Sequence, residues 1–216
     1  MKGQELGLLL KLVALNDREA QEHEKVSLKE FRALPQDWCD WTEGDNEDYT
    51  LTAYYEYGQN ADSYTVRALA RATSISKSQI SLALQNCQGM GLIRKDRVTG
   101  LPRVNRQALH NFIVHAARYV FPVKPGPLAR GIATTFASPA LEGELFSSGE
   151  LIMVWPDARG NSQGQSIEPL FKGVPHAVRR DRDLYAMLAL VDTIRLGRPR
   201  ESKLATEKLA TYLRIG

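Results

Sequence analysis

Residues 65–104 read TVRALARATSISKSQISLALQNCQGMGLIRKDRVTGLPRV, and this stretch decides the expected fold. Thr65 can cap the N-terminus of a helix over residues 66–72, whose inward side chains include Leu69. After a short turn, Ser76 can cap a second helix, and the apolar spacing within it gives one buried stripe: Ile80, Ala83, Leu84 and Cys87. The pattern therefore predicts two short helices joined by a tight turn.

A β-hairpin and a third helix are predicted directly downstream. Residues 92–97 and 101–104 are two short segments that flank Val98-Thr99-Gly100, the usual arrangement of a hairpin. Asn105 can cap the following helix, which should end before Pro122. Helix, turn, helix, hairpin and helix in this order are typical of a winged helix-turn-helix, in which the hairpin is the wing.

Charge is strongly segregated along the chain. Residues 65–130 hold eleven Lys and Arg residues against the single carboxylate of Asp96, a net charge of +10. The 64 residues before this segment carry a net charge of −8, and the 86 residues after it carry +1. Such a compact positive field in a chain of nearly balanced charge favours a polyanionic partner, for which double-stranded DNA is our expectation.

The second helix and the hairpin supply the candidate DNA contacts. Polar residues near the N-terminus of a recognition helix reach base edges in the major groove, where Gln pairs with adenine and Ser with either base. A helix N-terminus and lysine favour phosphate, and arginines on a wing are drawn to the backbone or the minor groove. The candidate DNA-binding residues are Thr65, Ser76, Lys77, Ser78, Gln79, Ser81, Gln85, Arg94, Lys95, Arg97 and Arg103.

This stretch resembles the winged-helix bacterial regulators of the MarR-like kind, and the likeness implies a DNA-binding transcriptional regulator. Positions that match the family's helix contact, turn, recognition helix and entry to the wing are Leu69-Ala70, Ile75-Ser76-Lys77, Ile80, Leu84 and Gly91-Leu92-Ile93. Two features depart from the family. Ser74 stands where these turns usually carry Gly, which requires that the backbone there avoid a positive φ. A long acidic insertion also precedes Thr65.

A second resemblance covers residues 106–210. It rests on the segments NRQALHNFIVHAARYVFPVKPGPLARGIATTFASP, VWPD and EPLFKGVPHAVRRDRDLYAMLALVDTIRLGRPRESKLA. These look like the C-terminal half of MarR-like regulators of unknown ligand, some of which are encoded beside nucleotidyltransferase-like proteins of the abortive-infection toxin type. The resemblance implies an antitoxin or autorepressor setting in bacterial defence.

The first third of the chain is predicted to be a helix followed by an acidic insertion. Apolar residues at spacings of three and four predict an amphipathic helix over residues 4–15. The insertion, at about residues 16–63, should contain a short helix over 28–34, an acidic loop over 36–48 and an aromatic stretch over 51–57 that suits either strand or helix.

Residues 121–216 are predicted to form a separate C-terminal region with a dimerisation or effector role. Seven prolines punctuate residues 121–176, where we expect loops and one or two short strands. A ligand pocket, a protein-docking surface and a cover over the core all remain open for this part. Apolar spacing predicts helices over 181–196 and 201–214. The expected fold class is mainly α (α+β), with the winged helix-turn-helix domain at residues 1–120 and this helical extension after it.

Composition and motifs narrow the function classes. The chain of 216 residues has no apolar run near the roughly 20 residues that span a bilayer, so we expect a cytoplasmic protein without a membrane partner. Its two cysteines lack CxxC spacing and its four histidines lack metal-ligand spacing, so we expect neither metal nor cofactor. No P-loop or GxGxxG motif occurs, and no histidine lies near Ser147-Ser148, which disfavours an enzyme.

The expected function is a dimeric repressor that acts at its own or a neighbouring promoter. One recognition helix and one wing bury too little surface for tight specific binding, whereas two half-sites a helical turn apart can supply it. We expect a homodimer held by the N-terminal helix and the last two helices. The alternative is a winged-helix protein-interaction module without DNA binding, which would use Trp38, Trp41 and the acidic loop.

Overall fold

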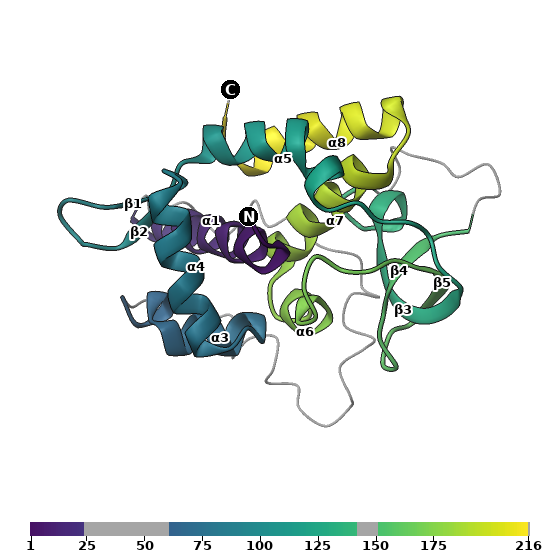
Figure 1. Ribbon diagram of the computed structural model, residues 1–216, viewed down its shortest axis with the longest axis horizontal. Helices are drawn as coiled ribbons and strands as arrows, with labels where there is room; N and C mark the ends of the chain where they lie inside the picture. Colours follow the sequence, from purple (N-terminus) through teal and green to yellow (C-terminus); the bar gives the residue numbers. More distant parts are fainter. Residues whose placement is uncertain (24–60, 142–150, 216) are drawn as a thin grey trace.

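The computed structural model describes residues 1–23, 61–141 and 151–215 (Figure 1). The chain is mainly helical, with a smaller strand content, as the expected α+β class requires. Thr65, Ser76 and Asn105 each accept a hydrogen bond from the backbone N–H three residues further on, which confirms the three predicted helix starts. The elements of this part are η3 (Ala61–Tyr64), α3 (Val66–Thr73), α4 (Lys77–Gly89), β1 (Ile93–Lys95), β2 (Pro102–Val104) and α5 (Arg106–Val120).

A Schellman motif ends α4 and turns the chain into the hairpin. The Leu92 N–H donates to the Cys87 carbonyl (2.9 Å) and the Gly91 N–H donates to the Gln88 carbonyl (3.0 Å). Gly91 has a φ of 72°, a left-handed conformation that glycine adopts without steric cost. Antiparallel β1 and β2 follow, with Arg94 opposite Arg103 in register.

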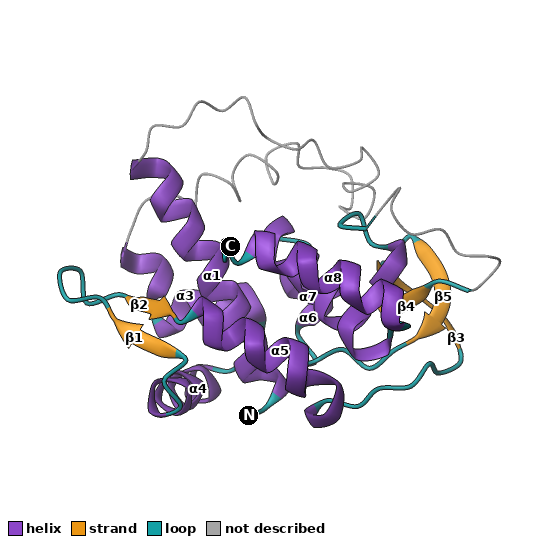
Figure 2. Cartoon of the chain, turned by 90° about the horizontal axis from the view of Figure 1, so that it is seen from above, coloured by secondary structure: helices purple, strands orange, loops and turns teal. Residues whose placement is uncertain are grey.

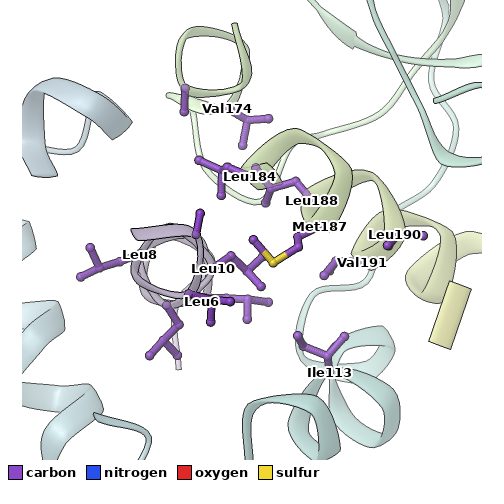
Figure 3. Packing of buried hydrophobic residues seen from close by; sticks show 14 of the residues in the cluster. Leu6, Leu8, Leu10, Ile113, Val174, Leu184, Met187, Leu188, Leu190 and Val191 are labelled. Atoms are coloured by element: carbon purple, nitrogen blue, oxygen red, sulfur yellow. The ribbon is translucent and has the colours of Figure 1, made fainter. Parts of the chain in front are cut away.

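Two buried helices, α1 (Gly3–His23) and α7 (Arg182–Leu196), form the centre of the molecule. Apolar side chains of α1 are buried on nearly all sides of the helix between Leu6 and Leu15, and every residue of α7 from Leu184 to Arg195 is buried. Figure 3 shows Leu10 of α1 pointing toward α7. Helices that are apolar on all sides belong in the interior of a protein. Burying one leucine side chain completely stabilises the folded state by about 1.5–3 kcal/mol.

The remaining helices cover this pair. The last helix, α8 (Pro199–Tyr212), packs along α7 and also contacts α5, and the short α6 (Val174–Val178) contacts both α3 and α7. Figures 1 and 2 both show the hairpin at one end of the molecule and the strands of the C-terminal half at the opposite end.

Three strands at that opposite end form a small closed sheet, whereas one or two were predicted. They are β3 (Leu128–Thr134), β4 (Met153–Pro156) and β5 (Ser162–Ser166), and the 3-10 turn η4 (Thr135–Ala137) follows β3. β3 is antiparallel to both other strands, which pair with each other in parallel. Closure brings the backbones very near one another: a Cβ at Gly131 would lie 2.1 Å from the Trp155 carbonyl oxygen.

A buried carboxylate fastens the start of α7 to α1. Asp181 caps α7 by accepting from the Leu184 N–H (3.1 Å), and the same carboxylate pairs with Lys11 Nζ (2.6 Å) and with the Arg18 guanidinium. Burial alone would raise the pKa of Asp181, but the two cations lower it to about 2. A paired charge of this kind is costly to disrupt, because removing one partner leaves the other buried without compensation.

A second buried carboxylate ties the closed sheet to α7. Asp192 accepts hydrogen bonds from Trp155 Nε1 (2.7 Å) and Thr134 Oγ1 (3.3 Å), and it pairs with Arg195 on its own helix. Burial raises the pKa of Asp192 despite these partners. The sheet is therefore attached to the helical core through the hydrogen bonds of Asp192 as well as through apolar packing.

Several expectations are corrected by this architecture. The helix predicted over residues 4–15 continues to His23, so the supposed insertion does not begin at residue 16. One apolar core includes residues from both sides of the predicted boundary at residue 120. The apolar faces of α1 and α7, two of the three helices expected to form the dimer interface, are already buried within one chain.

The two C-terminal helices are confirmed, since α7 and α8 match the ranges 181–196 and 201–214 to within two residues at each end. The features predicted for residues 28–34, 36–48 and 51–57, with Trp38 and Trp41, lie outside the described residues. Within the described ranges, no helix combines the length and apolarity needed to cross a membrane.

Candidate nucleic-acid interface

The outward face of α4 carries an exposed cation and several exposed polar side chains. Lys77, Ser78 and Gln85 are exposed, and Ser81 is partly buried. Lys77 makes no ion pair with any residue that the structure describes. The exposure of Lys77, Ser78 and Gln85 agrees with the free polar face that was predicted for this helix, and Ser81 is less exposed than the other three.

Two of the candidate hydroxyl groups are engaged in helix capping. Thr65 Oγ1 accepts from the Ala68 N–H (3.2 Å) and donates to the Asp62 carbonyl (2.8 Å). Ser76 Oγ accepts from the Gln79 N–H (3.4 Å) and lies 3.2 Å from Ser78 Oγ. Their main structural contribution is to start α3 and α4, which sets where the exposed residues of α4 begin.

Gln79 was predicted to lie on the free face of α4, and this prediction is wrong. Its side-chain oxygen accepts a hydrogen bond from Gln4 Nε2 on α1, and the side chain is partly buried. Two turns further along the same face of α4, Asn86 Nδ2 donates to Glu5 Oε1 (2.8 Å). The N-terminal turn of α1 thus holds α4 through two polar pairs that the sequence did not reveal.

The hairpin carries three exposed cations. Arg94, Lys95 and Arg97 have no carboxylate partner among the residues described. The tip is held by Asp96, whose Oδ1 accepts from the N–H of Val98 (3.0 Å) and from both the N–H (2.8 Å) and the hydroxyl of Thr99. These hydrogen bonds, led by that of the Thr99 N–H, lower the pKa of Asp96.

Arg103 was predicted to contact DNA, but an intramolecular ion pair already occupies its guanidinium. Its two Nη atoms donate to both carboxylate oxygens of Glu19 on α1, at 2.6 and 2.8 Å. Tyr64 Oη donates to the same carboxylate (2.9 Å), and burial is the main reason that the pKa of Tyr64 rises to about 12. Glu19 lies 84 residues from Arg103 in sequence, so no local pattern marks the pair.

Asn16 fixes the same strand to α1. Its Nδ2 donates to the Pro102 carbonyl (3.2 Å) and its Oδ1 lies 3.5 Å from the Val104 N–H, so one amide side chain pairs with the free edge of β2. The hairpin is therefore attached to α1 along β2, and its unpaired cations lie on β1 and at the tip.

Other cations of the basic segment also hold the fold. Arg106 pairs with Asp17 of α1 (2.6 Å), and Arg118 donates to the carbonyl oxygens of Arg195 and Gly197. Lys124 and Arg130 are exposed but lie at or near the closed sheet, away from α4. The local charge of +10 therefore overstates the free positive charge next to α4.

The turn between α3 and α4 contains the left-handed residue that the sequence expectation excluded. Ser74 has φ 55° and ψ 25°, although its side chain carries a Cβ. A left-handed backbone costs a non-glycine residue about 1–2 kcal/mol. Surrounding packing maintains it: Ile75 beside it is buried, and the backbone of Gly173 lies against the Thr73 carbonyl.

The site has the chemistry of anion binding. We call its four unpaired cations, Lys77, Arg94, Lys95 and Arg97, the free cations; they accompany Ser78, Ser81 and Gln85, which can donate and accept hydrogen bonds. In the described ranges, no group of three His, Cys, Asp or Glu side chains is arranged to hold a metal ion.

Comparison of the chain with protein-family models, with curated proteins and with solved structures found no match.

Proposed function

We propose that α3, α4, the β1–β2 hairpin and α5 act as a winged helix-turn-helix that binds double-stranded DNA and regulates transcription. In this proposal α4 enters the major groove and the hairpin contacts the backbone or the adjacent minor groove. The protein would act in the cytoplasm as a repressor at its own or a neighbouring promoter, in the manner of an antitoxin-type autorepressor.

The observation that carries the proposal is the set of free cations at the two ends of α4: one in its capped, exposed first turn and three on the hairpin that follows its last turn. Lys77 lies in the first turn of α4, where the helix dipole also favours an anion. Arg94, Lys95 and Arg97 project from a hairpin that α1 holds in place through Asn16 and Glu19. A cation without a carboxylate partner can bind phosphate and release counterions without first giving up an ion pair.

Base readout is assigned to the exposed polar residues of α4. Gln85 is exposed and makes no hydrogen bond to the rest of the described chain, so its amide is available to pair with adenine. Ser78 and Ser81 supply shorter contacts to either kind of base. Gln79 leaves this list, because it is bonded to Gln4.

A dimer remains part of the proposal, for the reason of affinity given above. Because the apolar faces of α1 and α7 are buried in the core, these two faces cannot form the interface with a second copy. No effector is proposed.

The test uses the purified protein and a duplex from the DNA upstream of its own coding sequence. Fluorescence anisotropy measures the binding at about 50 mM and about 200 mM salt. We expect tighter binding to this duplex than to a scrambled duplex of the same composition. An Arg200→Ala variant, which removes an exposed charge on α8, should bind as the wild type does.

One observation favours the second candidate, a protein-interaction module. Leu82 and Met90 of α4 have exposed fractions of 42% and 46%, and exposed apolar side chains on a helix suit a protein partner. Failure to bind any duplex at low salt would favour this alternative over DNA binding.

A further inference from the structure

We propose a second DNA-backbone contact, made by a basic cluster around α6 that touches phosphates of the same duplex beyond those reached by α4 and the hairpin. The cluster consists of Arg71 on α3, Arg159 in the turn after β4, and His176, Arg179 and Arg180 on or directly after α6. The inference rests on the proposed function and extends it to a surface that belongs to the C-terminal half of the chain.

The cluster is anchored to the turn that precedes α4. A Cβ at Gly173, just before α6, would lie 2.2 Å from the Thr73 carbonyl oxygen, so the two backbones are in direct contact. His176 Nε2 lies 3.2 Å from the Arg71 carbonyl at the end of α3. Ser76 follows Thr73 by three residues, a span of at most about 11 Å, so a duplex on the N-terminus of α4 passes near this surface.

Positive charge in the cluster exceeds its compensation. Four guanidinium groups are present, and Asp157 is the one carboxylate within ion-pair distance of any of them among the described residues, with its Oδ2 2.9 Å from Arg179 Nη2. Arg71, Arg159 and Arg180 are exposed. Burial lowers the pKa of His176, and Arg180, Arg179 and Arg159 lower it further, as expected for a site of concentrated positive potential.

The hydrogen-bond donors of the cluster are also incompletely satisfied. His176 Nε2 faces both the Arg71 carbonyl and Arg180 Nη1 (3.0 Å), but a single ring nitrogen either donates to the carbonyl or accepts from the guanidinium. Arg179 Nε is buried and makes no hydrogen bond to the described residues, whereas Arg179 Nη2 is buried against the Asp157 carboxylate that it pairs with. Phosphate oxygens accept several hydrogen bonds at once, so a phosphodiester suits the exposed guanidinium groups of Arg71, Arg159 and Arg180.

The experiment compares two double variants of the full chain that each remove two exposed positive charges. Arg159→Ala/Arg180→Ala changes the cluster, and Arg200→Ala/Lys203→Ala changes α8 as the control. Binding to the upstream duplex is measured by anisotropy across salt concentrations, and phosphate contacts are mapped by ethylation interference. Thermal unfolding establishes that both variants are folded.

We expect the cluster variant to bind about tenfold more weakly and to lower the salt slope by about one to two, at roughly 0.9 per lost phosphate contact. It should also lose interference at phosphates that Arg97→Ala leaves unchanged. If the cluster variant matches the α8 control in affinity, slope and interference while the wild type binds DNA, this inference is overturned and the proposed function stands. If the wild type binds no duplex, both are overturned.

Discussion

Two arginines face each other across the hairpin and have opposite environments. Arg103 on β2 is held by both oxygens of Glu19, whereas Arg94, its partner in register on β1, is exposed and unpaired. Like charges directly opposite each other destabilise a strand pair, and the carboxylate from α1 offsets that repulsion. The same residue type therefore fixes the hairpin on one strand and leaves a free charge on the other.

This difference extends through the molecule. We call Lys11, Arg18, Arg103 and Arg106 the paired cations, because each binds a carboxylate. In every pair, one member lies on α1, which connects the hairpin, α5 and α7. The paired cations position the site, and the free cations give it its charge, so substitutions in the two groups should have different effects on stability and on DNA binding.

The largest effect is expected at Asp181. Asp181→Ala leaves Lys11 buried and Arg18 without its main partner, so we expect a loss of about 3–5 kcal/mol in the free energy of unfolding, measured by urea denaturation. The matched control is Asp183→Ala, which removes a half-exposed carboxylate 3.4 Å from the same arginine and should cost less than about 1 kcal/mol. Equal losses for the two variants would contradict the assignment of Asp181 as the anchor of α7.

Acid should weaken the same contact. The folded-state pKa of Asp181 is about 2, below its ordinary value of 3.8, so the carboxylate contributes stability above pH 3.8 and loses it as the pH falls toward 2. Unfolding free energies measured from about pH 5 down to about pH 2 should fall less steeply for Asp181→Ala than for the wild type. Parallel curves would show that this carboxylate does not titrate as described.

Two glutamines on α4 differ in the same way as the two groups of cations, because one is bonded to α1 and the other is free. Gln85→Ala should lose about 1–3 kcal/mol of binding free energy on the upstream duplex and little on a scrambled one, because its amide is free to read a base. Gln79→Ala should instead lower the free energy of unfolding by about 1 kcal/mol, since it breaks the bond to Gln4. Anisotropy and urea denaturation of both variants decide between these roles, and a reversed pattern would return base readout to Gln79.

A smaller effect than that at Asp181 is expected where α4 passes into the hairpin. Gly91→Ala places a Cβ on a backbone with φ 72° and should cost about 1–2 kcal/mol of stability, although the space around it is open. Gly89→Ala, equally open but at the last helical position, should be neutral or stabilise by up to about 1 kcal/mol. Thermal unfolding of this pair separates backbone strain from side-chain packing, and a similar shift for both would argue against the strain.

Local signals explain what the sequence revealed about the fold. The caps at Thr65, Ser76 and Asn105 and the apolar spacing of α5 and α7 act within a few residues, so they can be read without tertiary information. The closed sheet could not be predicted in this way. Its strands are short and are paired by contacts between distant residues, and the need for a glycine at residue 131 is evident only once Trp155 lies against it.

The limits of prediction for the site have a similar cause. Asn16 and Glu19 follow the apolar stretch of α1 and were predicted to begin a polar insertion. In the structure they bind β2, through a hydrogen bond to Pro102 and an ion pair with Arg103. Charge and polarity identified the basic segment as the candidate DNA-binding part of the chain. Contacts with α1, which the sequence does not reveal, decide which side chains of that segment are available to bind DNA. Arg103 and Gln79 were assigned to DNA because their partners lie 84 and 75 residues away.

The most direct test of the division between paired and free cations is the salt dependence of DNA binding for Arg97→Ala and Arg103→Ala, measured side by side with the wild type. We expect Arg97→Ala to lower the slope by about one with no change in unfolding free energy. Arg103→Ala should keep the wild-type slope and lose about 1 kcal/mol of stability, a modest value because the pair is partly exposed. A slope lowered equally by both substitutions, or by Arg103→Ala alone, would contradict the division.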